Sequence, residues 1–299
     1  MKSIVIDARE SGTSTGRYID KLVEYLHWLK PAYNITVLTK SHRLDYIKSI
    51  APNFTVQESP YPEFTFTEQL GFRGQLDKLK PDLVHFGMVQ QPVLYRGRVV
   101  TTMHDLTTIR FRNPTKNFLV FTAKQWVYKW VNKKAARKSL AVITPTEFVK
   151  QDVANFTGID PSKIVVTLEA ADKISQPLEP IKTLVGKKFI TYVGRPLPHK
   201  NLGRLIEALA LLQKTSPELC LVLAGKKDDL FVQHENDAQK KGVKNIVFTG
   251  FVSEGELRWL YENAAAHIVP SLSEGFGLPG LEAMINGAPV VSSNATCLP

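Results

Sequence analysis

Short apolar runs alternate with segments of helix length along the whole chain, and this alternation limits the fold more than any other feature of the sequence. Strands that alternate with helices build parallel sheets whose two faces are covered by the helices. The strands predicted in the first half are Ile4–Ile6, Thr36–Leu38, Phe54–Gln57, Leu83–His85, Val99–Met103, Leu140–Thr144 and Ile164–Thr167. Those predicted in the second half are Phe189–Val193, Leu219–Ala224, Ile246–Phe248, Ala266–Pro270 and Val290–Ser292. The pattern therefore predicts an α/β protein.

The length of the chain, 299 residues, is too great for one average domain and suits two. The periodicity lapses around Lys173–Gly186, where prolines and polar residues gather. We therefore expect one domain over residues 1–172, a linker over 173–186 and a second domain over 187–299.

Composition excludes several classes of protein. The content of 43% hydrophobic and 22% charged residues is that of an ordinary globular protein. Two cysteines, Cys220 and Cys297, offer neither a disulfide framework nor a metal-binding set. The chain enters a strand directly after Met1 without a visible signal peptide, and no apolar run reaches the roughly 18 residues of a membrane span. We expect a cytoplasmic protein.

A glycine-bearing loop, Ser271–Leu278, joins a predicted buried strand to a short helix whose first turn contains Pro279. Such a loop lets backbone N–H groups and the positive end of the helix dipole approach a phosphate. Glu274 and Glu282 are suited to accept hydrogen bonds from sugar hydroxyls. Together these features predict a nucleotide-sugar site, although an isolated glycine loop is more often a plain strand-to-helix connection.

Two cations follow another predicted strand. Arg195 and Lys200 lie beyond Phe189–Val193 and before a helix, where their charge can hold a diphosphate and stabilise it as it leaves. No Asp-x-Asp pair follows an apolar strand, so no carboxylate pair for Mg²⁺ or Mn²⁺ is visible. We expect catalysis without a metal or other cofactor.

Four segments resemble glycosyltransferase family 4, the retaining enzymes of the GT-B fold. The run from Glu274 to Glu282 resembles the E-x7-E signature of that family, and Tyr192–Leu202 resembles its donor-phosphate segment. The dipeptide His104-Asp105 and the turn at Gly16 resemble its N-terminal site segments, with Ser14 where glycine is usual. The resemblance implies two facing Rossmann-like domains. It assigns catalytic roles to His104 and Glu274, and donor contacts to Gly16, Arg195, Lys200, Glu274, Gly275, Phe276, Gly277, Leu278 and Glu282.

The implied reaction moves a hexose from a nucleotide diphosphate sugar, of the GDP-mannose or UDP-glucose type, to a glycan or lipid-linked acceptor with retention of configuration. The family needs no enzymic nucleophile, because the departing phosphate helps to deprotonate the acceptor. Two alternatives remain open at this point. One is a non-catalytic sugar-nucleotide-binding or scaffold protein, and the other is a sugar-nucleotide epimerase of the same architecture.

Basic character is concentrated in the first part of the chain: residues 1–180 hold 25 Lys and Arg against 17 Asp and Glu, and residues 181–299 hold 13 against 11. Residues 110–138 contain nine basic side chains, no acidic one and several interleaved aromatics. A basic aromatic helix suits peripheral binding to the anionic inner face of a membrane. Aromatics packed into the core behind a solvated basic face are an equal alternative. Nucleic acid is a poorer match, because no recognition module accompanies the charge.

Members of the family normally continue with another strand and several helices after the segment that resembles Asn294–Pro299. We therefore expect an incomplete C-terminal domain, with donor binding retained and turnover impaired. An uncovered sheet edge and apolar surface would favour self-association.

Overall fold

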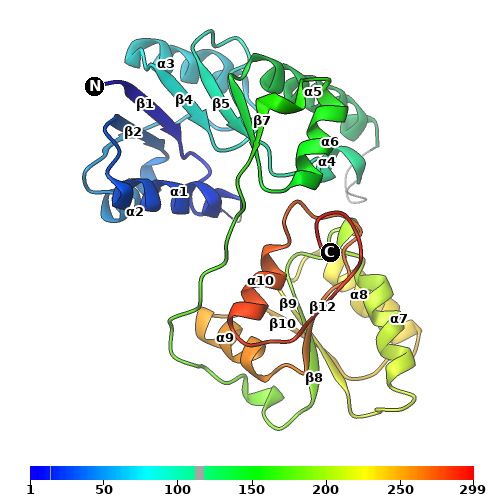
Figure 1. Ribbon diagram of the computed structural model, residues 1–299. Coiled ribbons are helices and arrows are strands. Elements are labelled where there is room, and N and C mark those ends of the chain that lie inside the picture. Colours follow the sequence, from blue (N-terminus) through cyan, green and yellow to red (C-terminus); the bar gives the residue numbers. More distant parts are fainter. Residues whose placement is uncertain (14, 112–117) are drawn as a thin grey trace. The chain divides into compact units, whose positions relative to one another are not determined.

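A computed structural model describes residues 1–13, 15–111 and 118–299. The described chain divides into two compact units. Unit 1 contains Met1–Ile109 and the later segment that ends at Leu168, and unit 2 contains Glu169–Pro299. Each unit has a parallel sheet with helices on both faces (Figure 1), so the predicted α/β class is confirmed.

Unit 1 is built on a seven-stranded parallel sheet with the strand order β3-β2-β1-β4-β5-β6-β7. Every one of these strands lies where the apolar pattern predicts one. Its strands are β1 (Ser3–Asp7), β2 (Asn34–Thr39), β3 (Thr55–Glu58), β4 (Leu83–Phe86), β5 (Val99–Thr102), β6 (Ala141–Thr144) and β7 (Ile164–Val166). Its helices are α1 (Gly16–Leu29), α2 (Leu44–Ile50), α3 (Arg73–Leu79), α4 (Thr107–Arg110), α5 (Phe118–Lys138) and α6 (Glu147–Thr157).

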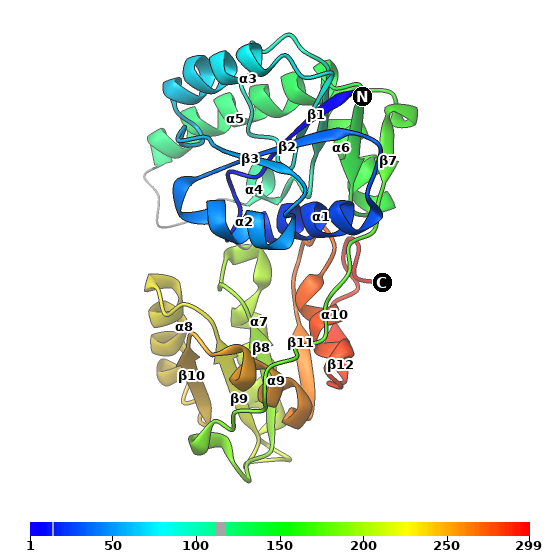
Figure 2. The ribbon, with the colours of Figure 1, turned by 90° about the vertical axis from the view of Figure 1, so that its left-hand side faces the viewer.

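Alternate side chains of β1 point to opposite faces of this sheet and pack in separate hydrophobic cores. Ile6 packs with Ile19 and Val23 of α1 on one face, whereas Val5 packs with Leu76 of α3 on the other. Helices α1 and α2 accordingly lie on one face, and α3 and α5 on the other (Figure 2). Apolar burial on both faces is what makes these strands near-continuous apolar runs in the sequence.

Unit 2 has a five-stranded parallel sheet with the order β10-β9-β8-β11-β12. Leu221 and Leu223 of β9 pack with α7 and α8 on one face, and Cys220 and Val222 pack with α9 on the other. Leu184, within the predicted linker, is buried in this second core. The strands are β8 (Phe189–Val193), β9 (Cys220–Ala224), β10 (Ile246–Gly250), β11 (Ala266–Val269) and β12 (Val290–Ser292), and the helices are α7 (Leu202–Leu212), α8 (Asp229–Lys240), α9 (Glu254–Asn263) and α10 (Leu278–Ile285).

The strand order reverses once in each sheet. In unit 1 the chain winds outward in opposite directions from β1 and β4, and in unit 2 from β8 and β11. The loops after such a pair of strands separate and leave a crevice at the carboxyl ends, which is where ligands bind in open α/β sheets. The two places to look for a site are therefore the loops after β1 and β4, and those after β8 and β11.

Helix α5 has both buried and exposed aromatic side chains, so each interpretation of the basic aromatic segment describes a part of it. Tyr128 packs against the core beneath the helix, whereas Trp126 is 73% exposed and Trp130 is 47% exposed. Residues 112–117 of the predicted segment lie outside the described residues. In the described chain, no helix combines the length and apolar character needed to cross a membrane.

Strand β12 forms one edge of the unit 2 sheet, and Val291 on it is more than half exposed. Met284 of the neighbouring α10 is also exposed. An edge strand with exposed apolar neighbours can pair with a second copy, and self-association stays a prediction.

Candidate functional site

The two loops that follow β8 and β11 are tied together. The backbone N–H of Leu272 donates to the carbonyl of His199 over 2.7 Å. The side-chain amide of Asn201 donates to the carbonyl of Pro270 over 3.1 Å. Asn201 stands in the left-handed region at φ 58° and occupies the N-cap position of α7, where its side chain makes no capping hydrogen bond. These contacts fix the β8 loop against the β11 loop at the point where the strand order reverses.

Lys200 and Glu274 meet between these loops. The ammonium nitrogen of Lys200 lies 2.7 Å from Oε1 and 2.8 Å from Oε2 of Glu274. Their side chains are only 20% and 11% exposed, and a largely buried charge-assisted pair is stronger than one in open water. Ser271 adds a third contact, since its hydroxyl donates to Glu274 Oε1 over 2.6 Å. The structure thus brings two of the predicted site residues into direct contact.

The backbone of Glu274 is held from a third segment. Its N–H donates to the hydroxyl of Thr296 over 3.0 Å, and the thiol of Cys297 donates to its carbonyl over 3.3 Å. The side chain and the main chain of Glu274 are therefore both fixed, so this carboxylate has a defined direction before any ligand binds.

Helix α10 begins directly after this loop. Gly275, Phe276 and Gly277 belong to the loop, and Leu278 is the first helical residue. Gly277 has φ +90°, in the left-handed region that favours glycine, and a Cβ there would lie 2.7 Å from a methyl carbon of Leu298, which would have to shift. Among the described residues, no side chain caps the first N–H groups of α10, which leaves them directed at the loop. Glu282 lies in the second turn and is partly buried.

Arg195 forms an ion pair that the sequence did not indicate. Its Nε donates to Oδ2 of Asp228 over 2.9 Å, while Oδ1 of Asp228 caps α8 by accepting from Leu230 and Phe231. The hydroxyl of Tyr192 donates to the Arg195 carbonyl over 3.1 Å. Burial, together with the charge of Glu274, raises the pKa of Tyr192, so this phenol stays protonated. Asp228 lies between the end of a predicted strand and the start of a predicted helix. This is the position of an N-cap residue, and it could have indicated the structural role of Asp228.

The remaining predicted site residues, Gly16 and His104, belong to unit 1. A Cβ at Gly16 would lie 1.7 Å from the carbonyl oxygen of Glu10, so only glycine fits. Its N–H donates to the hydroxyl of Thr13 over 2.9 Å. His104 follows β5, and its Nε2 donates to the carbonyl of Gly87 over 3.1 Å, while its ring meets that of Tyr18 edge-on. Their roles toward a ligand stay predictions.

Within the described ranges, no cluster of three or more His, Cys, Asp or Glu side chains is arranged to hold a metal ion. The charged groups at the unit 2 loops are instead two cations, Arg195 and Lys200, each held by one carboxylate. This arrangement suits an anionic ligand that also carries hydrogen-bond donors.

Comparison with solved structures identifies the fold. The chain superposes on sucrose-phosphate synthase from Thermosynechococcus elongatus with a TM-score of 0.72 and 16% identity, covering 100% of this chain and 82% of that one. It superposes on HepE of Anabaena, in a complex with UDP and glucose, with a TM-score of 0.71 and 16% identity, covering 99% and 82%. These likenesses define a GT-B fold, as predicted.

Residues 15–172, more than half of the chain, match the family described as Glycosyltransferase Family 4, and residues 177–299 match that described as Glycosyl transferases group 1. The chain belongs to glycosyltransferase family 4.

Among curated relatives, the O-antigen chain mannosyltransferase B of Escherichia coli is 30% identical over 221 residues, which is 68% of this chain and 54% of that protein. The MMP alpha-(1->4)-mannosyltransferase of Mycolicibacterium hassiacum is 28% identical over 242 residues, which is 77% and 56%. The chain thus spans about half the length of the curated relatives it matches.

Proposed function

We propose that the protein transfers a hexose from a nucleoside diphosphate sugar to a hydroxyl of a glycan or lipid-linked acceptor. The observation that carries this proposal is the contact between Lys200 and Glu274 at the strand-order reversal of unit 2. It combines a cation for phosphate with a carboxylate for sugar hydroxyls in one fixed place. The family assignment and the mannosyltransferase relatives support the same reaction class.

The hydrogen-bonding capacity of the pair fits such a donor. An ammonium group has three N–H donors, and Glu274 occupies two of those of Lys200, which leaves one for a phosphate oxygen. Oε1 of Glu274 accepts from both Lys200 and Ser271, whereas Oε2 accepts, among the described residues, from Lys200 alone. Since each carboxylate oxygen has about two lone-pair sites, Oε2 retains one for a hydroxyl of the transferred sugar.

The proposed chemistry retains the anomeric configuration and uses no metal. The bond between the anomeric carbon and the phosphate oxygen breaks while the acceptor oxygen bonds to that carbon from the same face. The acceptor proton passes to the departing phosphate oxygen. Arg195 and Lys200 stabilise the negative charge on the leaving diphosphate, and His104 and Glu282 contact the sugar and the ribose. The names of the relatives favour a mannosyl donor, and UDP-glucose is the main competitor.

Calorimetry with GDP-mannose and UDP-glucose tests donor binding. Lys200→Ala should weaken binding by roughly tenfold to a hundredfold, which corresponds to about 1.5–3 kcal/mol for a lost charge-assisted hydrogen bond. Lys214→Ala is the matched control, since Lys214 is an exposed lysine of unit 2 away from these loops. Absence of heat with every nucleotide sugar would contradict the proposal.

Turnover distinguishes transfer from the alternatives. A transferase releases the nucleoside diphosphate and extends an acceptor, an epimerase alters the sugar without releasing it, and a binding protein does neither. Transfer should persist in EDTA. Activity that disappears with EDTA and returns with Mn²⁺ would show that the two cations do not suffice.

We also propose that α5 brings the protein to the inner face of an anionic membrane. Trp126, Trp130 and Lys133 recur at helical spacing and are exposed together with Lys129. Indole rings settle at the lipid headgroup level, and lysines add attraction to anionic lipids.

Vesicle sedimentation tests this second proposal. The protein should pellet with vesicles that contain phosphatidylserine and not with neutral vesicles at low salt. The double variant Trp126→Ala/Trp130→Ala should lose most of this binding. Trp28→Ala, which removes an exposed tryptophan of α1, should keep it. Equal pelleting with both kinds of vesicle would rule out the charge contribution.

A further inference from the structure

The loop that follows β12, residues 293–298, supports the loop that carries Glu274. Both loops leave the sheet at the same edge, because β11 and β12 are neighbouring parallel strands (Figure 1). The hydroxyl of Ser293 donates to the carbonyl of Ser271, and the thiol of Cys297 donates to the carbonyl of Glu274 over 3.3 Å. We refer to residues 293–298 as the support loop.

The support loop contains a tight turn at Ala295–Leu298. The N–H of Leu298 donates to the carbonyl of Ala295 over 3.1 Å and closes this turn. Thr296 is the second residue of the turn and has φ 55°, in the left-handed region. Turns with a positive φ at that position are dominated by Gly, Asn and Asp, because a branched side chain crowds the backbone there. Thr296 therefore has a strained backbone conformation.

This strained conformation brings the hydroxyl of Thr296 to the candidate site. Its oxygen accepts from the N–H of Glu274, 22 positions away, over 3.0 Å. Glycine would adopt the turn without strain, but it has no side chain to make this contact. Strained residues persist where the surrounding structure determines their conformation, and they cluster at functional sites. The strain at Thr296 is therefore a reason to assign it a function at Glu274.

The position of the Glu274 backbone determines where its carboxylate lies. Lys200 and Ser271 hold the carboxylate oxygens, whereas Thr296 holds the peptide N–H of the same residue. A displacement of this peptide would move the carboxylate relative to a bound sugar. A misplacement of about 1 Å at a reacting group can cost roughly a hundredfold in rate, so a contact that fixes the peptide can control the chemistry.

We propose that Thr296 is a positioning residue that fixes the Glu274 carboxylate for the sugar of the nucleotide-sugar donor. This inference rests on the proposed function, because it deepens the role assigned there to Glu274. Thr296 acts through Glu274 and not by contact with the reacting atoms. Loss of its hydroxyl should therefore weaken recognition of the sugar and leave recognition of the diphosphate unchanged.

Calorimetry tests this difference by comparing GDP-mannose with GDP, and UDP-glucose with UDP. Thr296→Val keeps the branched shape and removes the hydroxyl, so the affinity for the nucleotide sugar relative to the nucleoside diphosphate should fall about tenfold. Thr296→Ser retains the hydroxyl and should keep the wild-type ratio. The control is Thr215→Val, which removes an exposed hydroxyl that donates to the carbonyl of Leu212 in unit 2, and it should change neither affinity.

Hydrogen exchange of the Glu274 amide tests the contact itself and needs no ligand. This amide should exchange about tenfold faster in Thr296→Val than in the wild type, because the hydroxyl that accepts from it is lost. Thr296→Ser should exchange at the wild-type rate. Thr296→Gly relieves the strain and also removes the hydroxyl, so it should melt no lower than Thr296→Val while its affinity ratio falls as far.

A structural role alone would give a different pattern, since it would weaken the binding of both ligands to the same extent. Such an equal loss in Thr296→Val, an unchanged exchange rate of the Glu274 amide in that variant, or failure of Thr296→Ser to keep the wild-type ratio would overturn this inference alone. Absence of nucleotide-sugar binding by the wild type would overturn the proposed function and this inference together.

Discussion

The ammonium nitrogen of Lys200 lies within 2.8 Å of both carboxylate oxygens of Glu274, although the two residues are 74 positions apart in the chain. Each residue neutralises the other in the absence of ligand. A bare phosphate would have to compete with Glu274 for Lys200, whereas a nucleotide sugar offers hydroxyls to Glu274 in exchange. Under the proposed function, the pair should therefore favour a complete donor over inorganic phosphate.

The coupling between these two residues should be measurable in stability. Lys200→Met leaves Glu274 largely buried beside only the Ser271 hydroxyl, so we expect a loss of roughly 1–3 kcal/mol in the free energy of unfolding. The double variant Lys200→Met/Glu274→Gln should lose less than the sum of the single changes. Urea denaturation of the four proteins gives the coupling energy, and strict additivity would show that the pair does not interact.

The N-cap hydrogen bonds of Asp228 should contribute more to the free energy of unfolding than its ion pair with Arg195. Arg195 is 57% exposed, so its pair with Asp228 is screened by solvent and contributes little to stability. Asp228→Asn preserves a good N-cap and should cost little, whereas Asp228→Ala should cost about 1 kcal/mol. Thermal unfolding of these variants checks the prediction. Asp229→Ala is the control, because Asp229 is an exposed neighbour that does not cap the helix. Equal losses for Asn and Ala at position 228 would contradict it.

Two buried histidines should make the fold sensitive to acid. Burial lowers the pKa of His267 and of His85 to about 4, with the charge of His104 contributing at His85. Between pH 6.5 and about 4 the unfolded chain takes up these protons and the folded chain does not, so stability falls as the pH falls, by roughly 3 kcal/mol per histidine.

The pH dependence of the free energy of unfolding tests this expectation. His267→Phe keeps the ring contact with Tyr261 and should flatten the slope between pH 6.5 and 4. Replacement of the exposed His42 by glutamine should leave the slope unchanged. A slope that His267→Phe does not alter would mean that this histidine is not buried in the neutral form.

Replacement of glycine by alanine should change the stability of the protein in opposite directions at two positions. At Gly16 the added Cβ would overlap the Glu10 carbonyl, so Gly16→Ala should destabilise unit 1 by several kcal/mol, on the order of the largest single-site effects. At Gly203, inside α7, a Cβ meets nothing within 4 Å. Gly203→Ala should therefore stabilise the protein by about 0.5–1 kcal/mol. Similar changes at both positions, measured by thermal unfolding, would contradict this reading.

The strands and the loop around Glu274 were predictable because the residue patterns that indicate them are local in the sequence. Apolar runs buried on both faces mark each strand, and Glu274, Gly277 and Pro279 stand close together in a loop and helix start. The contact of Glu274 with Lys200 was not predicted, although both residues were assigned to the same ligand. Each belongs to a loop after a different strand, and only the adjacency of β8 and β11 joins them.

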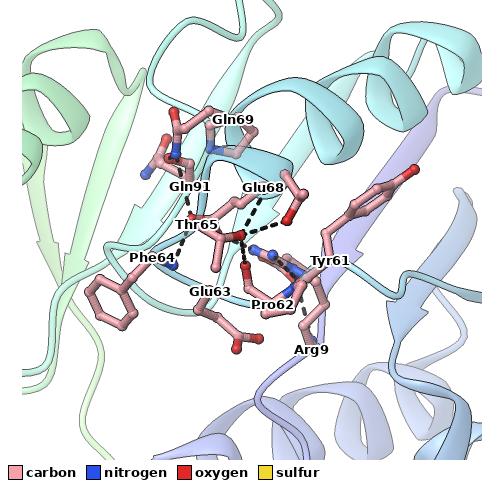
Figure 3. A network of polar contacts seen from close by, with 12 residues as sticks. Arg9, Tyr61, Pro62, Glu63, Phe64, Thr65, Glu68, Gln69 and Gln91 are labelled. Atoms are coloured by element: carbon pink, nitrogen blue, oxygen red, sulfur yellow. Dashed lines mark hydrogen bonds and ion pairs between the residues drawn. The ribbon is translucent and has the colours of Figure 1, made fainter.

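The network of polar contacts around Arg9 (Figure 3) was not predicted, although the neighbouring Gly16 was assigned to the site. Arg9 and Glu10 follow the first strand and read as ordinary surface charges, yet Arg9 is buried against Glu68, 59 positions away. Sequence carries no signal for such a long-range pair. Helix α5 shows a different limit, since its composition left open whether its aromatic side chains are buried or exposed, and the structure contains both kinds.

The carboxyl groups of Glu10 and Glu63 at the end of β1 have a kinetic consequence under the proposed function. They would repel the diphosphate of a nucleotide sugar that entered the crevice after β1. The rate would then rise to a plateau with increasing donor concentration, without a later decline.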